Sequence, residues 1–271
     1  GAGIFLFLFS LVQGEEAGWS SASFIAPIVL SLVLLVSFVL VERRAREPIV
    51  RPSLFKNRGI LGANVVALFV GITMLPFFLM TPTFAGGLFG LEDTLEVGIY
   101  MLPNAIATLI FSGIGGMQAR RTGAFKVLIT GMAILSAGFV SLLVFHSTFL
   151  ELALSQIILG AGIALCMVSL INVVVESCPK NEFGVASGMN TLFRIVGGSI
   201  GPVLATAILA TNTIAFGSMV LYTEEGYVQA WGVGLAFALI GLAASIFLRP
   251  RGVCSVDDLV SADQDADGTK L

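Results

Sequence analysis

The sequence predicts an all-α integral membrane protein, and three observations support that fold class. Hydrophobic residues make up 56% of the 271 positions and charged residues only 11%, whereas a soluble domain carries about 25% charged residues. Long apolar runs recur along the chain, and basic residues gather in alternate connections between them. The same composition excludes a disordered chain, and a net charge of −3 without a basic stripe argues against a nucleic-acid partner.

Seven apolar segments are long enough to cross a membrane, because about 20 helical residues span a hydrocarbon core of about 30 Å. They are residues 24–41, 60–80, 97–117, 127–145, 152–175, 185–211 and 228–248. An eighth run, residues 1–12, is too short to span and lacks the basic flank of a signal peptide. We interpret it as the end of a truncated transmembrane helix.

Charge placement predicts the orientation of these segments. If they alternate in direction, 13 of the 14 Lys and Arg residues lie on one side: Arg43, Arg44, Arg46, Arg51, Lys56, Arg58, Arg120, Arg121, Lys126, Lys180, Arg249, Arg251 and Lys270. The opposite connections hold acidic residues and no basic ones. Since basic loops stay in the cytoplasm, connections 42–59, 118–126 and 176–184 and the C-terminus are predicted to be cytoplasmic, in an inner or plasma membrane.

The longest and most charged of these connections marks a boundary in the chain. We expect residues 1–41 to be the end of a pair of transmembrane helices, one truncated and one complete. The cytoplasmic connection then covers 42–59, and a six-helix block covers 60–251. Residues 252–271 are polar and acidic, which predicts a disordered cytoplasmic tail.

Arg194 is the basic residue that lies inside a predicted helix, about 15 Å from its cytoplasmic end at a rise of about 1.5 Å per residue. A charge at that depth is costly and normally faces a bundle interior or a water-filled cavity. Two interpretations remain open. The residue is either a structural charge that holds helix ends together, or a counter-ion for a substrate or coupling element.

Amides inside the apolar segments are the next candidates, because an unsatisfied polar group in hydrocarbon must face protein or water. They are Asn64, Asn104, Asn172 and Asn190, on four different helices. Each either bonds a neighbouring helix or lines a shared central cavity. Phe77 and Phe78, with methionines close by, either provide an adaptable surface for lipophilic ligands or face lipid.

Small residues are concentrated in segment 185–211, where they allow helix backbones to approach closely in lipid. The pattern consists of Gly184, Gly188, Gly197, Gly198, Gly201 and Pro202. Tight packing alone explains it. A bendable helix at a moving interface, weakened where Pro202 lacks an N–H, is the functional alternative.

The chain has no sequence signature of an enzyme. No acidic residue lies in the middle of a predicted helix, no His, Asp or Glu cluster offers metal ligands, and no G-x-x-x-x-G-K-[ST] phosphate loop occurs. The single histidine, His146, is interpreted as a solvated residue at a loop end. We therefore expect no catalytic residue, no metal and no cofactor.

Short motifs along almost the whole chain follow the order typical of one family. They are Gly18-Trp19-Ser20; Glu42-Arg-Arg44, Pro48, Leu54-Phe55 and Arg58; Gly98, Leu102 and Pro103; Gly116, Arg121 and Gly123; and the glycine pattern of segment 185–211 together with Arg194. In these motifs the chain resembles the fourteen-helix drug:proton antiporters of the major facilitator superfamily. One position departs from the family pattern, since Arg120 stands where an acid usually precedes the arginine. The conformational lock that this acid supports in the family is therefore called into question here.

The resemblance implies that residues 60–251 are the C-terminal six-helix repeat, preceded by one complete and one truncated helix of an extra central pair. It also implies a substrate site near the midplane between two repeats and alternating access by rocking. The four asparagines, Phe77, Phe78 and Arg194 are then candidates for the cavity wall. Gly116, Arg120, Arg121 and Gly123 then belong to a conformational motif, together with the glycines and Pro202 of segment 185–211.

The expected function is proton-coupled efflux of lipophilic or cationic drugs. Its partners are then membrane lipid, the substrate, protons and a missing N-terminal six-helix half. Two alternatives remain open: a carrier of a small anionic metabolite with Arg194 as counter-ion, and a non-transporting membrane sensor or structural partner.

Overall fold

The computed structural model describes residues 3, 5, 6, 9, 10, 21–42, 57–90, 93–178, 182–216 and 219–248. Its helices are α2 (Ala22–Glu42), α3 (Arg58–Phe89), α4 (Thr94–Thr122), α5 (Ala124–Val144), α6 (Phe149–Ser177), α7 (Phe183–Thr211) and α8 (Glu224–Phe247). Two short strands, β1 (Thr213–Phe216) and β2 (Met219–Tyr222), connect α7 to α8. The predicted tail over 252–271 and most of the connection over 42–59 lie outside the described residues.

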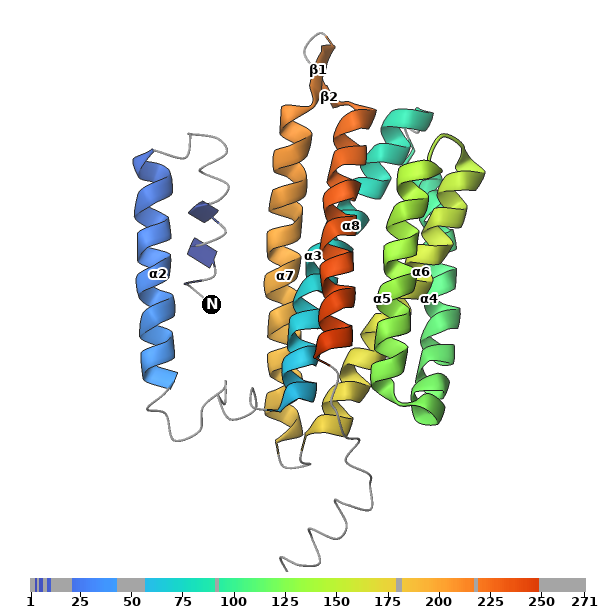
Figure 1. The fold of residues 1–271 in the computed structure, drawn as a ribbon. Helices are drawn as coiled ribbons and strands as arrows, with labels where there is room; N and C mark the ends of the chain where they lie inside the picture. The colour runs from blue at the N-terminus through green and yellow to red at the C-terminus, as the bar shows by residue number, and fades with distance from the viewer. Residues whose placement is uncertain are drawn as a thin grey trace, which may run out of the picture.

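Six helices, α3 to α8, are long and apolar enough to cross a membrane. They correspond to the last six predicted segments and confirm the all-α membrane fold. The first predicted segment is α2, which is 21 residues long. Figure 1 shows α2 apart from the six-helix bundle. Ser31 Oγ of α2 donates a hydrogen bond to the carbonyl of Gly3 at 2.7 Å.

Helix α3 extends to Phe89, well past the predicted end at residue 80. It begins where the Asn57 side chain accepts a hydrogen bond from the N–H of Gly59, and it contains Pro76 and Pro82. Membrane helices tolerate proline where neighbouring groups satisfy the freed backbone. The helix ends at Gly90, whose φ of 62° is left-handed and favours glycine.

The predicted loop over residues 118–126 is corrected by the structure. α4 continues to Thr122 and α5 starts at Ala124, so Gly123 alone separates the two helices. Its φ of 90° lies in a region that side-chain-bearing residues avoid. One glycine therefore replaces a loop, because it can reverse the chain direction within a single residue.

The six-helix bundle has two layers. α6 lies between α4 and α3, and α7 packs on the other side of α3, which gives the order α4–α6–α3–α7. α5 packs on α6, α8 packs on α3, and these two helices contact each other as a second layer. Figure 1 shows α7 and α4 at opposite sides of the bundle and α8 in front of α3. One face of the four-helix layer is thus covered, and the described residues leave its other face uncovered.

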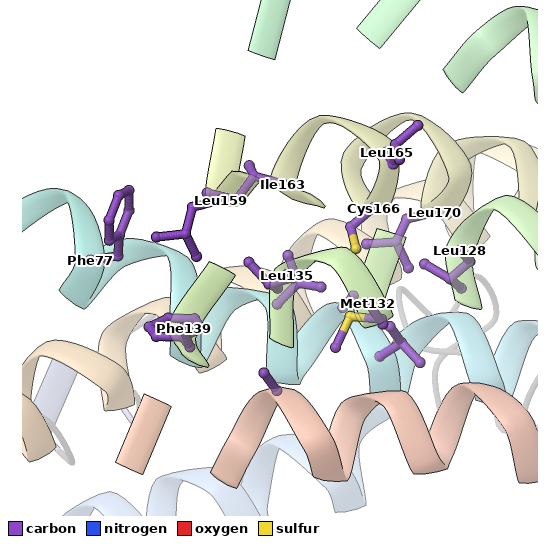
Figure 2. Packing of buried hydrophobic residues seen from close by; sticks show 14 of the residues in the cluster. Phe77, Leu128, Met132, Leu135, Phe139, Leu159, Ile163, Leu165, Cys166 and Leu170 are labelled. Carbon is purple, nitrogen blue, oxygen red and sulfur yellow. The ribbon is translucent and has the colours of Figure 1, made fainter. Parts of the chain in front are cut away.

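The apolar core lies between the layers (Figure 2). Leu128, Met132 and Leu135 of α5 are at most 1% exposed, and so are Leu159 and Cys166 of α6. In lipid, helix association depends on close packing rather than on the hydrophobic effect. This interdigitated layer boundary is therefore what holds α5 against α6.

The connection between α7 and α8 is a β-hairpin that the sequence analysis did not anticipate. β1 and β2 pair antiparallel, with Thr213 opposite Tyr222 and Phe216 opposite Met219. Figure 1 shows the hairpin at one end of the bundle, which we call the hairpin end. The described basic residues Arg58, Arg120, Arg121 and Lys126 lie on helix termini at the opposite end.

Candidate functional site

Arg194 of α7 extends toward the uncovered face of the four-helix layer. Its side chain is half-buried, and Nη1 lies 3.2 Å from the sulfur of Met167 on α6. The Arg194 side chain therefore links α7 to α6, two helices that also contact each other directly. The position agrees with both interpretations of Arg194, since the residue bridges two helices and remains partly open.

The polar environment of this guanidinium is incomplete. Among the described residues the thioether of Met167 is its only hydrogen-bond acceptor, and a thioether accepts weakly. A guanidinium carries five N–H donors in a fixed fork that matches carboxylate or phosphate oxygens. Arg194 therefore presents unused donors and a positive charge at the uncovered face.

Asn190 and Asn64 lie together one turn before Arg194. Asn190 Nδ2 donates to the carbonyl of Ala63 at 3.0 Å and to Asn64 Oδ1 at 3.3 Å, and both side chains are buried. Asn64 Nδ2 has no partner among the described atoms. This pair ties α7 to α3, as expected for an interhelical bond in lipid, and it leaves both N–H donors of the Asn64 side-chain amide unused among the described atoms.

The other two predicted amides lie elsewhere. Asn104 Nδ2 donates to the carbonyl of Gln156 at 3.1 Å, and Gln156 Nε2 donates to the carbonyl of Tyr100 at 2.9 Å, so both attach α4 to α6. Asn172 is half-buried, and its Nδ2 donates to the carbonyl of Val168 in its own helix at 3.0 Å. Among the described residues, the structure thus brings together two of the four amides, Asn64 and Asn190, and the other two make separate contacts.

Phe77 lies in the core rather than on an open surface. It is 1% exposed, and its ring centroid lies 5.5 Å from that of the partly buried Phe78. Phe77 borders a cavity of about 20 Å³ that is also lined by Pro76, Gly201 and Trp231. Drug-sized ligands need pockets of about 300–1,000 Å³. This cavity is too small for such a ligand, and none of the four asparagines lines it.

The small residues of α7 divide into two groups. A Cβ atom on Gly197 would collide with the carbonyl oxygen of Leu68, and one on Gly201 would collide with that of Ile72. Gly198 also faces α3, where its Cβ would lie 2.5 Å from Leu75 Cδ1. Gly184 and Gly188 have nothing within 4 Å of a built Cβ. The first group serves close packing on α3, and the second group is unpacked in the described structure.

The Ile72 carbonyl oxygen of α3 explains why α7 packs so closely on α3 at Gly201. Pro76 stands four residues later and has no N–H to donate to that carbonyl. Gly201 brings α7 against the freed oxygen, and the half-buried Pro202 follows it in α7. The proline of one helix thus lies against the Gly-Pro step of the other.

The predicted basic motif lies at the turn between α4 and α5. Arg120 and Arg121 are exposed in the last turn of α4, where cations interact favourably with the helix dipole. A Cβ on Gly116 would lie at ordinary contact distance from Val168 of α6. Gly123 forms the turn itself and has no side chain to cap α5.

Glu176 supplies that cap, and the sequence analysis did not select it. Its carboxylate oxygens accept from the N–H of Ala124 at 3.1 and 3.3 Å, across 52 residues of sequence. An acid at a helix N-terminus is favourable. Two features of the sequence could have indicated this cap. Glu176 is an acidic residue near the end of α6, and Gly123 has no side chain that could cap α5.

Replacing Glu176 by Ala is expected to lower the free energy of unfolding by about 1 kcal/mol, the usual loss when an N-terminal cap is removed. Thermal unfolding of the purified full-length protein in detergent measures the change. Glu176→Gln is the matched control, since it keeps an acceptor oxygen and should lose less. An Ala variant as stable as the wild type would contradict the capping role.

Two further groups escaped the sequence analysis. Gln156 is 0% exposed and bridges α6 to α4. An unsatisfied glutamine amide in hydrocarbon costs as much free energy as an asparagine amide, so the same reasoning predicts a buried partner for Gln156. His146 is not simply solvated, because both of its ring nitrogens have partners. Its partner Glu224 lies 78 residues away, a separation that gives no local signal.

The described residues include no group of three His, Cys, Asp or Glu side chains placed to hold a metal ion. Cys166 and Cys178 are free and buried. Outside the spanning segments, burial raises the pKa of the Cys178 thiol, and the Glu182 carboxylate adds to this effect. Cys178 is therefore a poor nucleophile, since thiolate is the reactive form.

The two-layer bundle of membrane-spanning helices, open on one face, agrees with what comparison with known proteins shows. A sequence model of the Major Facilitator Superfamily matches residues 1–202 and 97–253. The chain belongs to this superfamily and is a multi-pass membrane protein.

Its relatives include several drug transporters and resistance proteins. The chain is 32% identical to the multidrug transporter protein MdtP of Bacillus subtilis, over 77% of the chain and 40% of that protein. It is 26% identical to the multidrug resistance protein Stp of Mycobacterium tuberculosis, over 75% and 38%. It is also 26% identical to the puromycin resistance protein pur8 of Streptomyces alboniger, over 83% and 46%. The chain thus spans less than half the length of each of these relatives.

Proposed function

We propose that α3 to α8 form the C-terminal repeat of a secondary transporter that exports lipophilic or cationic drugs in exchange for protons. The observation that carries this proposal is the uncovered face of the layer α4–α6–α3–α7, with the half-buried Arg194 on it. In alternating access, substrate binds between two repeats near the midplane of the membrane. The uncovered face is one wall of such a site, and a preceding half of the protein provides the other.

The chemistry of this wall suits lipophilic substrates. Exposed apolar side chains occur on both central helices of the layer, α3 and α6. On α3 they include Leu79, and on α6 Leu154, Ile157 and Ile171. Apolar surface with few polar groups is typical of sites for drug-like molecules.

The proton-binding groups belong to the preceding half in this proposal. The acidic residues of the described spanning helices lie at helix ends, as Glu96, Glu151 and Glu176 do. Proton relays in transporters use carboxylates within the membrane. The greater length of the drug-resistance relatives leaves room for a half that contains them.

The proposed organisation follows the charge pattern. Residues 1–41 are the end of an extra helix pair, 42–59 the connection and 252–271 the tail, while α3 to α8 lie within the repeat over 60–251. The end with Arg58, Arg120 and Arg121 faces the cytoplasm, so the hairpin end faces outward across an inner or plasma membrane. Membrane lipid surrounds the bundle.

A small anionic metabolite is the second candidate substrate, because Arg194 has unused donors and no carboxylate partner among the described residues. A guanidinium binds carboxylates and phosphates through two parallel hydrogen bonds. In that case Arg194 recognises the substrate, whereas in drug efflux it supports the site or its coupling.

Reconstituted full-length protein tests the proposal. Vesicles with an imposed pH gradient are expected to move a fluorescent lipophilic cation such as ethidium against its concentration gradient. Collapse of the pH gradient by an ionophore should stop the movement, and protein-free vesicles are the control. Transport of a panel of small carboxylates and no movement of any lipophilic compound would replace drug efflux by the anion carrier. Absence of both would favour a non-transporting sensor or structural partner.

A further inference from the structure

His146 and Glu224 form an isolated contact at the hairpin end of the bundle. His146 follows the last residues of α5, and Glu224 is the first residue of α8. The ring Nε2 of His146 lies 3.0 Å from Glu224 Oε1, and its Nδ1 lies 2.7 Å from the carbonyl oxygen of Leu142. The contact therefore joins the ends of the two helices that make up the second layer.

Both ring nitrogens of His146 face oxygen atoms that accept hydrogen bonds. This arrangement determines how many protons the imidazole and the carboxylate must share. A carbonyl oxygen can only accept, so Nδ1 must donate to Leu142. A neutral imidazole has one donor and one acceptor nitrogen, which would leave a lone pair on Nε2 facing a carboxylate. A hydrogen bond between Nε2 and Oε1 therefore requires one proton more than a neutral imidazole and an ionised carboxylate supply.

The surroundings favour this proton on the imidazole. The ring lies at the C-terminus of α5 and the carboxylate in the first turn of α8, the positions where helix dipoles favour a cation and an anion respectively. The ring centroid of His146 lies 5.7 Å from that of Trp231 and 6.1 Å from that of Phe84. The Trp231 ring is within the distance of about 6 Å at which an aromatic ring attracts a cation.

The other titratable groups nearby are few. Glu151 of α6 is engaged in the helix cap, where it accepts from the N–H groups of Ser147 and Thr148 at 3.0 and 3.3 Å. α8 adds the exposed Glu225 and the buried Tyr227, and β2 adds Tyr222. The part of α3 that ends here, residues 81–90, has no titratable side chain.

We propose that His146 and Glu224 form a one-proton binding site that latches the hairpin end of α5 to that of α8. Proton binding to Nε2 closes the latch. Loss of the proton leaves two acceptors facing each other and opens it. Because the closed form binds one more proton, a rise in pH favours opening. The site lies far from Arg194 and does not depend on which substrate the protein transports.

Trp231 reports on the latch directly, because a protonated imidazole in contact with an indole quenches its fluorescence. The purified full-length protein is titrated from pH 5 to pH 9, and the signal of a Trp231→Phe variant is subtracted to isolate Trp231. Its emission is expected to rise with pH. His146→Gln should abolish the rise, Glu224→Gln should move it to lower pH, and the neighbouring Glu225→Gln should leave it in place. A Trp231 signal independent of pH, or a rise that persists in His146→Gln, would overturn the proposal.

A thermal unfolding cycle provides a second test that does not depend on fluorescence. At pH 5.5, His146→Gln and Glu224→Gln should each lower the unfolding temperature by about 2–4 °C, with no further loss in the double variant. At pH 9 Glu224→Gln should not differ from the wild type, and His146→Gln should lose only what its Leu142 bond and ring contacts contribute. Equal effects at both pH values would mean a contact that holds no titrating proton. Since neither experiment measures transport, the failure of drug efflux and the failure of the latch are distinguishable.

Discussion

Replacement of Arg194 by Gln in the full-length protein is expected to lower drug transport about tenfold or more. The change removes the only charge that the described spanning helices place on their uncovered face, and hydrogen bonds to charged groups contribute about 1.5–3 kcal/mol each. A difference of about 1.4 kcal/mol in an activation barrier is tenfold in rate. Initial rates of ethidium movement in proteoliposomes, normalised to the amount of reconstituted protein, measure the effect.

Two variants show what Arg194 does. Arg194→Lys keeps the charge without the planar fork of donors, so recovery by Lys indicates a role for charge, and no recovery indicates bidentate bonding. Arg58→Gln removes an exposed charge at the start of α3 and should leave transport unchanged. Wild-type drug transport by Arg194→Gln would remove Arg194 from the site. Loss of transport for anionic compounds alone would favour the metabolite carrier.

Replacement of Gly197 by Val is expected to prevent stable folding. Its Cβ would collide with the Leu68 carbonyl oxygen, and backbone cannot move aside as a flexible side chain can. Overpacking of a core typically costs about 1–3 kcal/mol, and here the α3–α7 contact would have to separate. The yield of monodisperse protein and its unfolding temperature, measured by size-exclusion chromatography and heating, report the loss.

Gly188→Val is the matched control, because it makes the same substitution in the same helix where nothing lies within 4 Å. This variant should fold like the wild type. A Gly197→Val protein as stable as Gly188→Val would refute the packing role of Gly197.

The site residues differ in how far the sequence could predict them. The depth of Arg194 follows from counting residues along one helix, and the structure places it half-buried as a mid-helix charge should be. The grouping of four asparagines did not follow, because each side chain's direction depends on the rotation of its helix against neighbours. Only Asn64 and Asn190 meet, while Asn104 faces α6 and Asn172 bonds its own helix.

The ends of the helices, too, were only partly predictable from the sequence. Apolar length predicted seven segments, six of which, α3 to α8, are long and apolar enough to span in the described structure. Yet α3 continues past Pro82, and one glycine replaces the loop predicted over 118–126. The Glu176 cap that completes this turn comes from a helix end 52 residues away. A local pattern cannot supply such a partner.

Apolar length and the uneven distribution of basic residues are properties of each segment, and both can be counted from the sequence alone. Spanning a membrane requires only apolar length and satisfied backbone hydrogen bonds within one helix. Which face of a helix is buried depends instead on partners distant in the chain. Tertiary structure therefore decided that Gly197 packs on α3 while Gly188 stays open, although both are small residues of α7. It also turned His146 from a solvated loop residue into the partner of Glu224, because only the packing of α5 against α8 brings those two side chains together.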